Sequence, residues 1–305
     1  MSLALLITGA AGQLGTDLLA LARPARDVAF ARGLTSRQLD LTDPFAVRDV
    51  VREWARVVRS DSPAHRLVVI NPAAYTAVDD AETDEDQAYA VNAAGPALLA
   101  AACEQVGAHL VQLSTDYVFA GDASRPYDVD SPTGPTSAYG RTKLAGEQAV
   151  REVLPDASWV VRTAWLYGAA GGNFVKTMAA LESTRDTVAV VDDQRGSPTW
   201  TRDLAEALLT LARQQPAAGI LHATNSGNTT WHGLASAVFA ELGADPVRVA
   251  PTTTAAFPRP APRPAYSVLS GAAWEQAGLP PFRDWRSALA AAFALQGSDL
   301  RPPVT

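Results

Sequence analysis

Residues 3–22 read LALLITGAAGQLGTDLLALA, and this stretch decides the fold. It opens with an apolar run, Leu3–Ile7, of the kind that forms a buried strand. A glycine turn, GAAGQLG, follows at residues 9–15, and leucines at helical spacing come next. A GxxGxxG between a strand and a helix is typical of a dinucleotide-binding turn, because glycines let the backbone approach a pyrophosphate at the helix N-terminus. We therefore expect a dinucleotide to bind at Gly9, Gly12, Gln13, Leu14 and Gly15, in preference to a turn that serves packing alone.

The strand–helix alternation continues through the first half of the chain. Further short apolar runs predict strands at 28–31, 67–70, 110–113 and 159–162. Such alternation predicts an α/β fold with a Rossmann-type, doubly wound parallel sheet. The regular alternation of strands and helices ends near residue 166. We expect a dinucleotide-binding domain over 1–165, to which later segments (about 188–225) return, and a smaller C-terminal α/β substrate-binding region over 166–305.

Composition excludes several classes of protein. The 305 residues are 48% hydrophobic and 19% charged, which is enough to bury a large core. The net charge of −7 argues against a nucleic-acid partner but not against a nucleotide ligand. No uninterrupted apolar run of about 18 residues predicts a membrane span, and no signal peptide is recognisable, so a cytoplasmic protein is expected. The one cysteine, Cys103, lies in an apolar helical run and is expected to be buried and unreactive.

The end of the second predicted strand bears on the choice of dinucleotide. An acidic residue there would favour NAD by binding the ribose 2′-hydroxyl. The chain has Phe30-Ala31-Arg32 instead. Arg32 can pair with a 2′-phosphate, which favours NADPH, although NADH remains possible. The alternative is that Arg32 is a solvated loop charge.

Tyr139 and Lys143 form a Tyr-x-x-x-Lys pair at the start of a predicted helix, where they share one face. A nearby ammonium is expected to lower the pKa of the phenol, which can then protonate a carbonyl oxygen. Thr115 follows the predicted strand 110–113 at the carboxyl edge of the sheet, where such folds bind ligands. We predict Thr115, Tyr139 and Lys143 as a catalytic set; the alternative is an exposed helical pair without a role.

With these motifs the chain resembles an extended short-chain dehydrogenase/reductase, and further segments narrow the resemblance to the dTDP-4-dehydrorhamnose reductase family. The resemblance runs from about residue 3 to 295. The segments that carry it are Ser114–Phe119, Asn71–Asp79, Ala90-Val91-Asn92, Arg162–Gly168, Asn173-Phe174-Val175, Asp193–Thr199 and Arg263–Ser267. The Asp-Gln-x-Gly-x-Pro-Thr and Arg-Pro-x-x-Ser patterns in the last two are the discriminating ones.

The resemblance implies a role for each matching residue. On the cofactor side, Gly12, Gln13 and Leu14 would hold the pyrophosphate, and Asp40 and Leu41 would flank the adenine. Ala73, Ala74 and Tyr75 would line the nicotinamide ribose side, Lys143 would bond that ribose, and Asn92 would also belong to the cofactor site. On the substrate side, the implied residues are Thr115, Asp116, Tyr117, Trp165, Asn173 and Arg263. Trp165 would pack against the sugar, and Asn173 and Arg263 would lie towards the nucleotide diphosphate.

The resemblance predicts NADPH-dependent reduction of dTDP-4-dehydro-β-L-rhamnose to dTDP-β-L-rhamnose. Tyr266 stands where the family usually has Asn and Pro72 where alanine is usual, which bears on the shape of the pocket. Some members dimerise around a metal, but Arg202 falls where a carboxylate ligand would be needed, so no metal and a monomer or weak homodimer are expected. Two alternatives stay open: a nucleotide-sugar epimerase or dehydratase, and a non-catalytic NADP-binding regulatory subunit.

Overall fold

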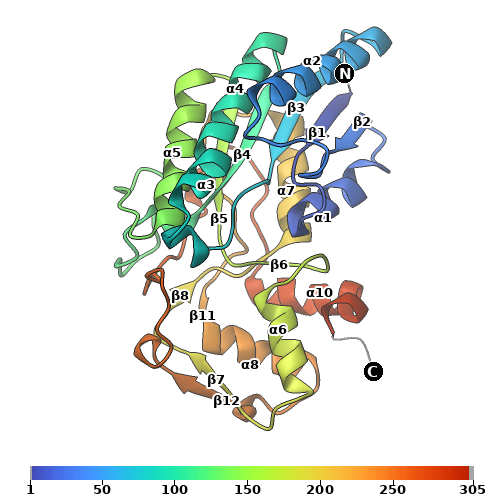
Figure 1. Cartoon of the computed structure of the whole chain (residues 1–305). Helices are drawn as coiled ribbons and strands as arrows, with labels where there is room; N and C mark the ends of the chain where they lie inside the picture. Colours follow the sequence, from blue (N-terminus) through green and yellow to red (C-terminus); the bar gives the residue numbers. More distant parts are fainter. Residues whose placement is uncertain (1, 302–305) are drawn as a thin grey trace.

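The computed structural model describes residues 2–301, and its centre is a six-stranded parallel sheet (Figure 1). The strand order is β10-β5-β4-β3-β1-β2. Their bounds are β1 (Leu3–Ile7), β2 (Val28–Gly33), β3 (Arg66–Asn71), β4 (His109–Thr115), β5 (Ser158–Thr163) and β10 (Gly219–His222). The α/β fold with a Rossmann-type doubly wound sheet is thereby confirmed.

The sheet is covered on both faces, which explains why its strands are apolar throughout. In β1, Leu3, Leu5 and Ile7 pack into one hydrophobic core, and Ala4 and Leu6 pack into another on the opposite face. Because side chains alternate along a strand, a continuous apolar run supplies both cores. The first core includes helices α1 (Gln13–Ala22) and α7 (Thr201–Gln214); the second includes α2 (Pro44–Asp61), α4 (Gly95–Val106) and α5 (Ala138–Val153).

A smaller part lies beneath the sheet in Figure 1 and has a third core of its own. It contains helices α6 (Phe174–Glu182), α8 (Trp231–Glu241) and α10 (Trp285–Leu300), with β7 (Val188–Val191) paired to β12 (Val249–Thr252). Between β7 and α8, the chain returns to the large sheet through α7 and β10. β7, which lies in the range 188–225 that is expected to return, stays in the smaller part. The domain limits at 165 and 166 stay a prediction. Short elements complete the fold: α3 (Glu85–Tyr89), β6 (Leu166–Tyr167), β8 (Arg195–Gly196), β9 (Thr199–Trp200), β11 (Thr229–Thr230) and α9 (Ala272–Gln276).

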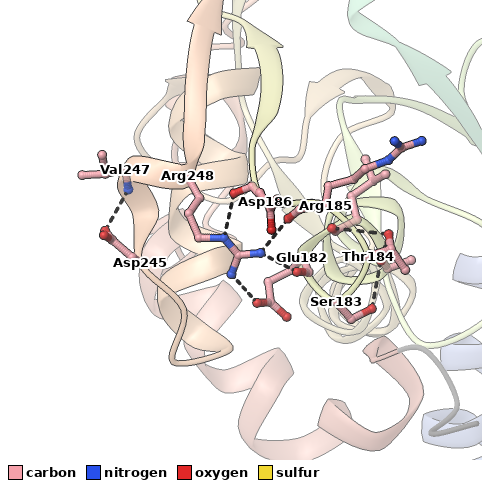
Figure 2. Close-up of polar contacts among 10 residues, drawn as sticks. Glu182, Ser183, Thr184, Arg185, Asp186, Asp245, Val247 and Arg248 are labelled. Atoms are coloured by element: carbon pink, nitrogen blue, oxygen red, sulfur yellow. Dashed lines mark hydrogen bonds and ion pairs between the residues drawn. The ribbon is translucent and has the colours of Figure 1, made fainter.

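The Arg248 side chain connects the end of α6 to the segment just before β12 (Figure 2). The Arg248 guanidinium binds the Glu182 carboxylate at 2.7 Å and donates to three backbone carbonyls, those of Glu182, Arg185 and Asp186, at 2.6 to 3.1 Å. These carbonyls belong to the end of α6 and the residues after it, where helical partners run out. A cation at a helix C-terminus also interacts favourably with the helix dipole. Arg248 therefore fixes the end of α6 beside β12.

Two segments differ from what the sequence pattern predicts. The alanine- and leucine-rich run at 88–104 predicts one continuous helix, but a π-helical turn, Ala90–Ala94, interrupts it, and Asn92 in that turn bonds the backbone of Tyr75. The polar residues 296–305 predict a disordered tail, but the chain is helical as far as Leu300, after a non-helical residue at Gln296. Gln296 accepts a hydrogen bond from Trp200 Nε1 at 3.0 Å, which anchors that segment. Residues 302–305 of that tail lie outside the described residues.

None of the helices within residues 2–301 combines the length and the apolar character that crossing a bilayer requires.

The first prediction concerns a buried ion pair that joins α5 to β5. Arg162 donates to both carboxylate oxygens of Glu147 at 2.9 and 2.7 Å, and both side chains are 3% exposed or less. Glu147→Ala leaves a buried, unpaired guanidinium, which we expect to lower the free energy of unfolding by about 3–5 kcal/mol. Glu53→Ala removes the partner of an exposed arginine, Arg56, and should leave stability unchanged. Denaturant unfolding of both variants checks this, and equal midpoints would contradict it.

Candidate functional site

A cleft of about 900 Å³ opens at the carboxyl ends of the strands, between the sheet and the smaller part. Most of the residues singled out from the sequence line it. They are Gly9, Gly12, Gln13, Leu14, Gly15, Asp40, Leu41, Ala73, Ala74, Thr115, Asp116, Tyr117, Tyr139, Lys143 and Trp165. Segments up to about 150 residues apart in the chain therefore meet in one cavity large enough for a dinucleotide and a second ligand.

The glycine turn is built for close backbone approach. Gly9 has a φ of +55°, in the left-handed region that favours glycine. A Cβ on Gly15 would lie 2.3 Å from the Gly9 carbonyl oxygen and 2.8 Å from the Ala10 Cα. The turn has no acidic side chain, and α1 begins directly behind it, with its free N–H groups towards the cleft. These features fit the pyrophosphate of a dinucleotide.

Two glycines in α5 bring Tyr139 to the cleft. Ser137 caps the helix by accepting a hydrogen bond from the Gly140 N–H at 3.1 Å. A Cβ on Gly140 would lie 2.3 Å from the Tyr117 carbonyl oxygen, and one on Gly146 would lie 2.1 Å from the Asn92 carbonyl oxygen. Only glycine permits these contacts, so the first turns of α5 pack directly against their neighbours. The ring of Tyr139 consequently meets that of Tyr117 edge to face, with centroids 5.6 Å apart.

The ionisable groups of the catalytic set are shifted by burial. Burial raises the pKa of Tyr139 to about 12, although the Thr115 side chain lowers it. Burial also lowers the pKa of Lys143 to about 8, while Glu147 raises it. The expectation that Lys143 lowers the pKa of Tyr139 is not met in the free protein, because loss of solvent outweighs other effects at the phenol. The Lys143 ammonium instead donates to the Leu113 carbonyl at 2.6 Å.

Asp116 contacts the predicted catalytic set through Thr115. Its Oδ1 accepts a hydrogen bond from Thr115 Oγ1 at 2.9 Å, and burial raises the pKa of its carboxyl to about 6. The bond fixes the rotamer of Thr115, whose Oγ1 also accepts from the Tyr117 N–H at 3.2 Å. Because the Thr115 hydroxyl donates its proton to Asp116, it can donate a hydrogen bond to a ligand oxygen only after that bond rearranges or Asp116 takes up a proton.

Two tryptophans form a wall of the cleft. Trp165 has a φ of +47° and stacks on Trp231 with centroids 3.5 Å apart. A side chain at Gly196 would lie 2.4 Å from the Trp165 ring, so this glycine makes room for the indole. Trp231 Nε1 donates to Gln194 Oε1 at 3.1 Å, which fixes the second ring. An uncommon backbone conformation held by such packing is frequent at binding sites.

Five of the predicted residues lie outside the cleft lining. Arg32 is exposed on β2, and its charge acts on Glu53 of α2. Asn92 is buried and clamps the Tyr75 backbone, accepting from its N–H at 2.8 Å and donating to its carbonyl at 3.1 Å. Asn92 therefore fixes Tyr75 in the loop after β3.

Asn173 and Arg263 lie outside the cleft lining, next to elements that contribute to it. Asn173 caps α6 and donates to Gln13 Oε1 at 3.0 Å, joining the smaller part to the glycine turn. Arg263 pairs with Asp79 at 2.8 Å.

Sequence reasoning missed several residues that line the cleft. Thr35 and Ser36 follow β2, and their position at the carboxyl edge of a strand would have indicated them. The eight-residue spacing of Trp231 and Phe239 predicts a core helix face, and Trp231 does pack against the third core, but it also lines the cleft from the first residue of α8. No local pattern indicates its place in the cleft, because Trp231 meets Trp165 only when the chain folds. Over residues 2–301, no three His, Cys, Asp or Glu side chains are grouped to hold a metal ion.

A Rossmann-type sheet with a Tyr-x-x-x-Lys pair at its carboxyl edge is the arrangement of the short-chain dehydrogenase/reductase class. Within that class, the chain belongs to the family described as RmlD substrate binding domain, whose model matches residues 3–296.

Relatives and solved structures agree with this assignment. The chain is 54% identical to a dTDP-4-dehydrorhamnose reductase of Streptomyces griseus, covering 97% of this chain and 95% of the relative. It is 55% identical to a probable dTDP-4,6-dihydroxy-2-methyloxan-3-one 4-ketoreductase of Streptomyces antibioticus, covering 94% of each. The crystal structure of a Bacillus anthracis dTDP-4-dehydrorhamnose reductase in complex with NADP superposes with a TM-score of 0.89 at 37% identity, covering 96% of this chain and 99% of that one.

The second prediction tests the glycine turn. Gly15→Ala places a methyl group against the Gly9 carbonyl, so we expect a loss of about 1–3 kcal/mol in the free energy of unfolding and weaker binding of NADPH. Gly172→Ala is the matched control, because it also lines the cleft and its Cβ would meet nothing within 4 Å. NADPH fluorescence titration and thermal unfolding measure both effects. Equal behaviour of the two variants would contradict the close approach.

Proposed function

We propose that this chain is an NADPH-dependent reductase of nucleotide-linked 4-keto-6-deoxy sugars that converts dTDP-4-dehydro-β-L-rhamnose to dTDP-β-L-rhamnose. The observation that carries the proposal is the convergence of Thr115, Tyr139 and Lys143 on a cleft whose other wall is a glycine turn. The names of relatives at 54% identity and the NADP complex of a structure at 37% identity support the reaction and the cofactor.

Each residue of the cleft has its own role in the proposed reduction. Bound NADPH supplies a hydride for the sugar C4 carbonyl carbon. Tyr139 gives its phenolic proton to the carbonyl oxygen, and a pKa of about 12 in the free protein keeps that proton in place at neutral pH. Thr115 orients the same oxygen, and the Lys143 ammonium stabilises the phenolate that remains. Trp165 and Trp231 provide an apolar wall on the sugar side.

Each remaining site residue keeps the role expected from the sequence. Gly12, Gln13 and Leu14 hold the pyrophosphate, and the other cofactor residues are Gly9, Gly15, Arg32, Asp40, Leu41, Ala73, Ala74, Tyr75 and Asn92. The substrate residues are Asp116, Tyr117, Trp165, Asn173 and Arg263. We further propose that the enzyme acts in the cytoplasm, where its cofactor and nucleotide-sugar substrate would be available, as a monomer or weak homodimer.

A second substrate is favoured by one observation. The relative named for a dTDP-4,6-dihydroxy-2-methyloxan-3-one is 55% identical, about as similar as the relative named for dTDP-4-dehydrorhamnose. Both names describe dTDP sugars with a ketone to be reduced, so the substrate class is the same and the sugar differs. An epimerase or dehydratase would return the hydride to the sugar and consume no NADPH, and a regulatory subunit would bind NADPH without turnover.

A direct assay separates these possibilities. Purified protein is mixed with NADPH and dTDP-4-dehydrorhamnose, and the loss of NADPH absorbance is followed while the product is identified by chromatography. We expect NADPH loss to match dTDP-rhamnose formation, and to be faster than with other dTDP-4-keto sugars. Tight NADPH binding without oxidation on any of these sugars would contradict the proposal.

The third prediction isolates the proton donor. Tyr139→Phe keeps the ring that packs on Tyr117 but removes the proton, so kcat should fall on the order of 10²- to 10⁴-fold while NADPH binding persists. Single-turnover kinetics and NADPH titration measure the two effects. The control is Tyr89→Phe, an exposed tyrosine of α3, which should behave as wild type. A Tyr139→Phe enzyme with near-normal kcat would refute the assignment.

The fourth prediction concerns pH. Because burial lowers the pKa of Lys143 to about 8, its ammonium is charged below that pH and is lost as pH rises through it. An ammonium that donates to the cofactor ribose should therefore make NADPH binding weaken above about pH 8. Titrations of NADPH from pH 7 to about 10 should show this in wild type and a flat profile in Lys143→Met. The same profile in both proteins would exclude Lys143 as its source.

A further inference from the structure

The cleft lacks cations for the substrate proposed above. A nucleotide sugar carries a diphosphate with two negative charges, and a recognition site for it normally supplies Arg or Lys. Among the described residues that line the cleft, Lys143 is the one cation, and it is committed to the reaction centre. Positive charge for the diphosphate must therefore come from the margin of the cleft.

Residues 253–264 form a strap that carries two arginines, Arg259 and Arg263, along that margin. One end of the strap is fixed to the smaller part. Asp193 accepts from the Thr254 N–H at 2.9 Å and from Thr254 Oγ1 at 2.6 Å, and Gln194 Nε2 donates to the same hydroxyl at 2.9 Å. Gln194 is also the residue that holds Trp231, so this anchor is continuous with the aromatic wall of the cleft.

The other end of the strap is fixed to the sheet side by the Asp79 carboxylate, in addition to the packing of Pro264 on Gly121 and the hydrogen bond from the Tyr266 N–H to the Gly121 carbonyl. Asp79 Oδ1 accepts from Arg263 Nη2 at 2.8 Å and from the Ala261 N–H at 3.3 Å, and its Oδ2 lies 3.6 Å from Arg259 Nε. Arg263 Nη1 also donates to the Ala261 carbonyl at 3.0 Å, which stiffens the turn. Asp79 thus joins three points of the strap to the loop after β3, and Figure 1 shows the orange strap rising from the smaller part towards α3.

This anchor lies beside the cleft. Val78, the residue before Asp79, lines the cavity, as does Tyr117. Burial and the Asp116 carboxylate raise the pKa of the Tyr117 phenol, and the Arg263 guanidinium lowers it, which is consistent with the position of Arg263 near the cleft. The strap ends at Pro264, which packs against Gly121 on the sheet side.

We propose that Asp79 is a positioning residue that holds the strap across the mouth of the cleft, so that Arg259 and Arg263 face the diphosphate of the nucleotide sugar. The inference rests on the proposed function, and what it adds to it is the anchor Asp79 and the second guanidinium, Arg259. Two guanidiniums share one carboxylate, which leaves a net positive charge. Arg259 is 63% exposed and keeps most of its donors free for a phosphate.

Substitution of Asp79 separates position from charge. Asp79→Ala removes the acceptor for Arg263 and the Ala261 N–H, and we expect the KM for the nucleotide sugar to rise about tenfold or more, with kcat and the KM for NADPH within about twofold of wild type. Asp79→Asn keeps an acceptor oxygen at the same place, so its KM should stay within about threefold of wild type. Asp80→Asn, at the exposed neighbour, is the control and should change nothing.

Arg259→Ala tests the second guanidinium in a residue that no core depends on. We expect weaker binding of dTDP, about tenfold by calorimetry, and a smaller dependence of that binding on salt. Arg185→Ala is the matched control, because Arg185 is an exposed arginine at the end of α6 whose guanidinium contacts none of the residues drawn in Figure 2. If thermal unfolding shows that the Asp79→Ala variant is not folded, the comparison of Arg259→Ala with Arg185→Ala alone tests the inference.

The outcomes distinguish this inference from the function on which it rests. Active wild type whose KM is unchanged by both Asp79→Ala and Arg259→Ala would overturn the inference and leave the reductase intact. Tighter dTDP binding in both Asp79→Ala and Asp79→Asn would show that the carboxylate acts only as a competing charge, which also overturns it. Wild type that neither binds dTDP nor reduces a dTDP sugar would overturn the proposed function, and the inference with it.

Discussion

A buried chain of hydrogen bonds crosses the carboxyl ends of three neighbouring strands and ends at Lys143, a member of the proposed catalytic set. Thr8 Oγ1 donates to Asn71, Asn71 Nδ2 donates to Gln112 Oε1 at 2.7 Å, and Gln112 Nε2 donates to the Leu113 carbonyl at 2.9 Å. That carbonyl also accepts from Lys143 Nζ at 2.6 Å. Buried polar groups require partners, so each member of the chain fixes the next. The position of the Lys143 ammonium is therefore set by β1, β3 and β4 together.

The other catalytic groups depend on how closely α5 packs onto this edge. Gly140 and Gly146 let the helix touch the backbone of its neighbours, and any side chain at either position would push Tyr139 away from Thr115. The smaller part completes the cleft from the opposite side by presenting Trp165 and Trp231. The sheet and α5 thus carry Thr115, Tyr139 and Lys143, and the smaller part carries the aromatic wall of the cleft.

Short sequence patterns predict those parts of the site that lie within a single turn or helix. The GxxGxxG turn and the Tyr139 and Lys143 pair are legible because each lies within one turn or one helix, and the parallel sheet follows from continuous apolar runs such as Leu3–Ile7. The place of Trp231 in the cleft and the helical continuation after Gln296 are not predicted, because their partners lie far away in the chain, at Trp165 and Trp200. The raised pKa of Tyr139 was also missed, since burial of a helix face cannot be read from the spacing of two residues.

Isotope transfer tests the central claim most directly. NADPH carrying deuterium at nicotinamide C4 is incubated with the protein and dTDP-4-dehydrorhamnose, and the product is examined by NMR. The account predicts dTDP-rhamnose labelled at sugar C4, formed in the same amount as NADPH is consumed. Conversion of the sugar without consumption of NADPH, or deuterium at any other carbon, would contradict a 4-keto reductase.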